Sequence, residues 1–67
     1  MGRGNGTGPT GPEVLFEFTQ VGVQMRVAAI DVATATEVVV IAPAAASRGH
    51  MEALALAKLR RRLAQEQ

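Results

Sequence analysis

Three short segments rich in β-branched and aromatic residues limit the folds open to this chain. They run from Val14 to Gln20, from Val23 to Asp31 and from Glu37 to Ile41. In the first segment apolar side chains alternate with polar ones, which is the period of a strand with one buried face. Only two residues separate the first two segments and five separate the next two, as in hairpin connections. The pattern predicts a three-stranded antiparallel β-meander.

We expect the first hairpin to turn at Val21-Gly22, because glycine readily adopts the positive φ that a two-residue turn requires. This register gives the two phenylalanines apolar partners on one face. On the other face it pairs Glu17 with Arg26, which we interpret as a solvated sheet pair and not as a catalytic dyad. The predicted pairs are Gln20–Val23, Phe18–Met25, Glu17–Arg26 and Phe16–Val27.

The second connection spans residues 32–36 and has the composition of a hairpin loop. Asp31 and Thr34 suit turn hydrogen bonds. Ala35 stands where glycine would be favoured for a left-handed position. The third strand is a continuous β-branched run in its middle, from Val38 to Val40, which indicates burial on both faces. A run without alternation leaves the register of the second and third strands open.

A helix is predicted from Met51 to about Gln65, after Pro43 ends the third strand. Ser47 is a suitable N-cap. Basic residues fall in the last turns, where positive charge suits the helix dipole. The apolar stripe at helical spacing consists of Met51, Ala55, Leu56, Leu59 and Leu63. The expected fold class is α+β: a β-β-β-α domain over residues 13–67, with its C-terminal α-helix packed across one face of the sheet.

Residues 1–12 are dominated by glycine and proline. A segment of this composition cannot offset its ordering entropy by burial, so we expect a flexible, disordered arm that becomes ordered only against a partner. The run from Gly4 to Gly8 superficially resembles a phosphate-binding loop. That motif needs a strand before it and a helix after it, and the sequence predicts neither here.

The side chains that carry chemistry are few and scattered. The chain has no cysteine, which excludes disulfides and thiolate metal sites, and a single histidine cannot build a zinc site alone. His50 has no nucleophile or carboxylate at a recognisable spacing, so we interpret it as a surface or helix-start residue. The six acidic residues lie on separate elements. We therefore predict no enzyme activity, no metal and no cofactor.

Charge and hydropathy favour a cytoplasmic protein. The formal net charge of +1 is too small to indicate a polyanion partner by bulk charge. No apolar run is long enough for a membrane span, and no charged start precedes an apolar block as in a secretory signal. The lack of cysteine is consistent with a reducing compartment.

One helix can cover only one face of the predicted sheet, and the other face keeps a group of apolar side chains. A contiguous exposed patch of this kind indicates a partner. We predict a small non-enzymatic interaction module, either a homo-oligomer or an accessory subunit of a larger protein assembly. Two copies could pack sheet to sheet, or the edge of the third strand could extend another sheet. The candidate partner-facing residues are Leu15, Ala28, Ile30, Val39 and Ile41.

The alternative is a nucleic-acid-binding module that uses the basic helix. As a bare pattern, the basic run from Lys58 to Arg62 is more typical of a solvated helix C-terminus. The layout resembles the final strands and helix of double-stranded-RNA-binding domains, whose first helix and paired lysines are absent here. It also resembles the three-stranded DNA-binding module of some integrases and plant transcription factors. The sheet of that module contacts DNA through exposed arginine and aromatic side chains, and Arg26 is the only such residue expected here. The candidate phosphate-contacting residues are Arg48, Lys58, Arg60, Arg61 and Arg62.

A closer resemblance covers nearly everything after the arm. The chain resembles a family of short uncharacterised alphaproteobacterial proteins that has the same β-β-β-α layout and no established activity to transfer. Ala35 and Ala42 depart from positions where that family is expected to have glycine. The matching residues are Val14 to Phe18, Gly22, Val27 to Asp31, Thr34, Glu37, Val38, Pro43 and Leu54 to Leu63.

Overall fold

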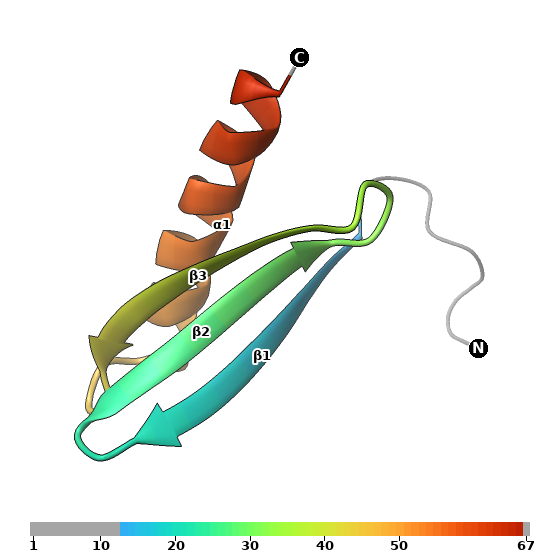
Figure 1. The fold of residues 1–67 in the computed structure, drawn as a ribbon. Helices are drawn as coiled ribbons and strands as arrows, with labels where there is room; N and C mark the ends of the chain where they lie inside the picture. The colour runs from blue at the N-terminus through green and yellow to red at the C-terminus, as the bar shows by residue number, and fades with distance from the viewer. Residues whose placement is uncertain (1–12, 67) are drawn as a thin grey trace, which may run out of the picture.

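A computed structural model describes residues 13–66 of the chain, so the expected arm over residues 1–12 lies outside the described residues. Three strands form one antiparallel sheet in the order β1-β2-β3, and a single helix follows them (Figure 1). The predicted β-β-β-α fold is confirmed. The elements are β1 (Val14–Val21), β2 (Gln24–Asp31), β3 (Thr36–Pro43) and α1 (Arg48–Gln65).

The first hairpin turns one residue later than predicted, at Gly22 and Val23. The strand pairs therefore shift by two residues, and the predicted Glu17–Arg26 pair is wrong: Glu17 faces Ala28 and Arg26 faces Thr19. Gly22 has φ +62° and stands first in the turn, where a type II′ turn needs positive φ. The predicted turn would have placed β-branched Val21 first. Since a two-residue shift preserves the faces, the predicted inward and outward sets are unchanged.

The second hairpin has the turn chemistry predicted for it. The Asp31 carboxylate accepts hydrogen bonds from the Thr34 backbone N–H at 3.0 Å and from the Thr34 hydroxyl at 2.6 Å. Ala35 adopts φ +60°, the left-handed position where glycine is favoured. The register that the sequence left open pairs Val27 with Val40.

Helix α1 begins at Arg48, three residues before the predicted start at Met51. The Ser47 side chain accepts a hydrogen bond from the His50 backbone N–H at 3.1 Å, which confirms the predicted N-cap. The helix presents Met51, Ala55 and Leu59 to the core. They pack against strand residues of the same face, which are Val27, Ala29, Val38 and Ala42, with Val14, Phe16, Phe18 and Leu63 partly buried around them.

The helix covers the sheet unevenly. It packs on β2 and β3, and β1 is the edge strand that lies furthest from it (Figure 1). As a result Val27, Ala29 and Val38 are buried, whereas the helix-facing residues of β1 are only half-buried. The fold therefore has one complete core beneath α1 and two less protected regions: the outer face of the sheet and the β1 edge.

Candidate interaction surfaces

An apolar stripe crosses the face of the sheet opposite α1. Strand pairing places Leu15 beside Ile30 and Ala28 beside Val39, while Ile41 lies one row further along β3. These five residues, which we call the outer stripe, run diagonally from one edge strand to the other. Leu15 is 49% exposed and Ile41 57% exposed, so the two ends of the stripe project furthest into solvent. The predicted partner-facing residues thus lie on one face.

Ala28 differs from the other four residues of the outer stripe, because it is fully buried, with 0% exposure. Its methyl group is the smallest side chain of the stripe and lies in the central strand, among larger neighbours. The prediction that Ala28 itself is available to a partner is therefore wrong. The middle of the outer stripe is therefore less exposed than its two ends.

Charged side chains flank the outer stripe. Glu17 lies beside Ala28 on β1, Arg26 lies one row away on β2, and Glu37 lies beside Ile30 on β3. All three are exposed. An apolar centre with a charged margin is the usual composition of a protein interface.

The two edges of the sheet differ. Lys58 on α1 donates a hydrogen bond from Nζ to the Val39 carbonyl oxygen at 2.7 Å. This carbonyl points away from β2, at the free edge of β3, and it therefore already has a partner. A lysine at a strand edge is a common obstacle to further strand pairing. No strand within residues 13–66 pairs with the outer edge of β1. Local sequence patterns do not indicate this difference, because Lys58 lies nineteen positions from Val39.

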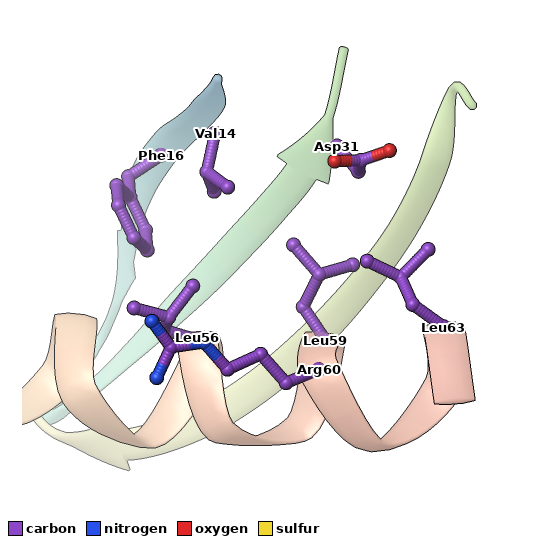
Figure 2. Close-up of a pocket in the computed structure, with 7 residues that line it drawn as sticks. All are labelled: Val14, Phe16, Asp31, Leu56, Leu59, Arg60 and Leu63. Atoms are coloured by element: carbon purple, nitrogen blue, oxygen red, sulfur yellow. The ribbon is translucent and has the colours of Figure 1, made fainter. Parts of the chain in front are cut away.

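An open groove of about 280 Å³ lies between β1 and α1. Figure 2 shows the leucine side chains of the helix directed toward the strands, with Phe16 and Val14 on one side and Asp31 at the end of β2. Asp31 is only 4% exposed, and its Oδ2 is held by Thr34. The walls are mostly apolar, and Arg60 is the charged side chain on the helix side. The lining residues are Val14, Phe16, Asp31, Leu56, Leu59, Arg60 and Leu63.

The structure divides the predicted phosphate-contacting residues among three places. Lys58, Arg61 and Arg62 border one hollow beside β3, whereas Arg60 lines the groove beside β1. Arg48 lies at the other end of the helix, where its guanidinium carbon is 4.4 Å from the centroid of the Phe18 ring.

Several of these cations already have partners within the chain. The Arg48 side chain binds Glu52 at 3.3 Å, and Arg62 lies 3.9 Å from the Glu66 carboxylate. Lys58 holds the Val39 carbonyl. The basic helix is therefore not one continuous phosphate-binding surface.

The residue types that bind metal ions do not cluster in the described part of the chain. In residues 13–66 no group of three or more histidine, cysteine, aspartate or glutamate side chains could hold a metal ion. His50 is exposed at the first turn of α1. The described part of the chain also contains no helix with the length and apolar character needed to cross a membrane.

Comparison with known families matches residues 11–66 to a domain of unknown function, DUF6898. The chain belongs to this family. The match extends over all three strands and the helix, so the family model and the folded domain coincide. No curated protein and no solved structure matches the chain. The description of this family names no activity.

Proposed function

We propose that the chain is a non-enzymatic interaction module that self-associates, with the outer stripe of one copy packed against the outer stripe of a second. The supporting observation is that an apolar stripe with exposed ends crosses the one face that α1 leaves uncovered. Single exposed apolar residues are ordinary, whereas a contiguous patch is typical of an interaction site.

The stripe is symmetric about its centre. Leu15 and Ile41 lie one strand and one row to either side of Ala28. Strands are about 4.8 Å apart and alternate residues about 6.8 Å apart. With these spacings, a two-fold axis in the plane of the face, crossing the stripe at Ala28, places Leu15 against Ile41 of the second copy. An isologous contact requires this kind of self-complementarity.

The same axis brings opposite charges together. It places Arg26 of each copy close to Glu17 of the other, because the two residues lie on opposite sides of the axis and at the same position along it. Two symmetric ion pairs would then border an apolar centre in which Ile30 meets Val39. Complementary charges of this kind fix the relative orientation of two surfaces more than they add affinity.

A charge exchange tests this contact. Arg26→Glu should weaken self-association by about tenfold or more, because it places two carboxylates against each other twice in the dimer. Glu17→Arg should do the same. The double variant R26E/E17R should restore association, since both symmetric pairs return with reversed sign. Sedimentation equilibrium of the full chain measures each dissociation constant.

Arg61→Glu is the matched control, because it makes the same change in net charge on the opposite side of the molecule. It should leave the dissociation constant unchanged. A monomer at all concentrations, or weakening by R26E without recovery in the double variant, would contradict the proposed contact. Circular dichroism shows whether each variant is folded.

Nucleic acid binding is the competing outcome of the same experiments. If the hollow bordered by Lys58, Arg61 and Arg62 binds phosphates, recovery from cells should depend on nuclease treatment and binding should weaken steeply with salt. Arg61→Glu would then abolish the interaction and R26E would spare it. The partners already assigned to Lys58 and Arg62 favour the self-association proposal.

We place this function in the cytoplasm, which is consistent with a chain without cysteine. The resemblance of the segment from Val14 to Leu63 to short alphaproteobacterial proteins supports a bacterial source. An accessory role in a larger assembly would use the same stripe, and purification from the native cell would then recover a heteromeric complex in place of the dimer.

A further inference from the structure

We infer that the outer edge of β1 pairs with β1 of a second copy, in antiparallel register about Phe16. The two sheets would then join into one sheet with both helices on the same face. This contact lies on a different surface from the outer stripe and goes beyond the proposed function. The inference depends on the backbone direction, the contrast between the two edges and the sequence of β1.

The backbone of β1 has a complete set of outward-pointing groups. Glu13 directs its carbonyl oxygen toward the β2 side, where it accepts a hydrogen bond from the Val32 N–H at 3.1 Å. In an antiparallel strand the direction of the backbone N–H and C=O groups alternates from residue to residue. The backbone groups of Leu15, Glu17 and Thr19 therefore point toward β2, and those of the even-numbered residues point away from it. The outward donors and acceptors belong to Val14, Phe16, Phe18 and Gln20.

The two sheet edges are not equally accessible to another strand. Along β3, Lys58 binds the outward Val39 carbonyl, and an incoming strand would have to displace it. Pro43, at the end of the same strand, has no N–H to donate. Within residues 13–66, β1 has neither device. A second strand would therefore add at β1.

The sequence of β1 selects one register for pairing with itself. Centring the pair on Phe16 places Phe16 against its own copy and Val14 against Phe18 on the helix side. On the other side Glu17 faces Leu15. Centring it on Glu17 would place two carboxylates opposite each other, which is unfavourable. Centring it on Phe18 would put Phe16 against the polar Gln20.

This register also covers the row that α1 leaves half-buried. Val14, Phe16 and Phe18 are partly buried in the single chain, because the helix lies over β2 and β3. Phe16 and Val14 form the strand wall of the open groove (Figure 2). Three apolar cross-strand pairs would shield the strand-edge side of this row, and aromatic pairs are among the favourable cross-strand contacts.

Amide hydrogen exchange of the full chain, followed by NMR, tests this pairing with controls inside the same strand. The Leu15 and Glu17 amides point toward β2 and should exchange slowly at every concentration. The Phe16 and Phe18 amides should exchange at least about a hundredfold more slowly in concentrated than in dilute solution, because no strand within residues 13–66 pairs with them and a second copy would. Fast exchange of Phe16 and Phe18 at all concentrations would overturn the inference, as would protection that does not change on dilution.

A cross-link test fixes the register. The chain has no cysteine, so Leu15→Cys and Glu17→Cys each introduce a single thiol at an exposed position. An oxidised mixture of the two variants should yield a disulfide-linked pair, whereas each variant alone should remain uncross-linked. Dimers of the Glu17→Cys variant alone would show the register centred on Glu17 and would contradict the register centred on Phe16.

These tests separate the edge contact from the stripe contact. The charge-exchange variants act on the outer stripe, while the Phe16 and Phe18 amides report only on the β1 edge. Unprotected Phe16 and Phe18 amides in a chain whose association is rescued by R26E/E17R would overturn the edge contact and retain the stripe. Protected amides with no response to the charge exchange would do the reverse.

Discussion

Ala35 carries a backbone conformation that its side chain disfavours. Its φ of +60° costs a residue with a Cβ roughly 1–2 kcal/mol, and glycine avoids this strain but loses more conformational entropy on folding. We predict that Ala35→Gly raises the free energy of unfolding by about 0.5–1 kcal/mol. Urea denaturation of the two proteins measures the difference.

Ala57→Gly is the matched control, because Ala57 is exposed in the middle of α1. There the same substitution should lower the free energy of unfolding by about 1 kcal/mol. A gain at both positions, or at neither, would contradict the account of strain at Ala35.

At the scale of single residues the sequence predicted local turn chemistry well. The Asp31–Thr34 hydrogen bonds and the Ser47 cap involve groups three positions apart, and such bonds depend on residue type and spacing alone. The first turn was misplaced because Gly22 lies in the turn in both the predicted and the observed placement. The signal that separates them is Val21, whose β-branched side chain opposes the positive φ that the predicted placement would require.

Among the elements, α1 both covers the core and protects the β3 edge. We predict that Lys58→Met exposes the outward side of β3 by removing the hydrogen bond to Val39, and that the variant forms species larger than the parent protein does. Sedimentation velocity at matched concentrations measures their size. Arg61→Met, which removes a neighbouring cation bordering the same hollow, should leave the size distribution unchanged.

The order of the elements and the two faces of β1 and β2 followed from the pattern of apolar residues, but the exact ends of the elements and the long-range relations did not. A pattern with period two assigns Leu15 and Phe16 to opposite faces without any knowledge of the partner strand. It cannot show that α1 lies over β2 and β3, nor that Lys58 reaches Val39. These features depend on the crossing of helix and sheet, and for this reason the β1–α1 groove was absent from the sequence predictions.

For the whole molecule, association should be visible in thermal stability. A small domain buries a limited share of its surface, and a contact made only by the folded state adds stability that rises with concentration. We predict that a hundredfold increase in protein concentration raises the Tm on the order of 10 °C, given the unfolding enthalpy typical of a chain this size. Differential scanning calorimetry checks this.

R26E should show a weaker dependence of Tm on concentration, whereas the double variant R26E/E17R should recover that of the parent protein. A Tm independent of concentration across this range would contradict both proposed contacts between copies.

The hydrogen bond from Lys58 to the Val39 carbonyl bears on how far a sheet built from several copies can grow. A monomer with two reactive ends grows into a chain of any length, whereas a monomer with one reactive end stops at a pair. Lys58 occupies one end of the sheet and so reduces the number of reactive ends from two to one. If β1 pairs as proposed, Lys58 and Pro43 together separate a sheet that ends at two copies from one that propagates into a fibre.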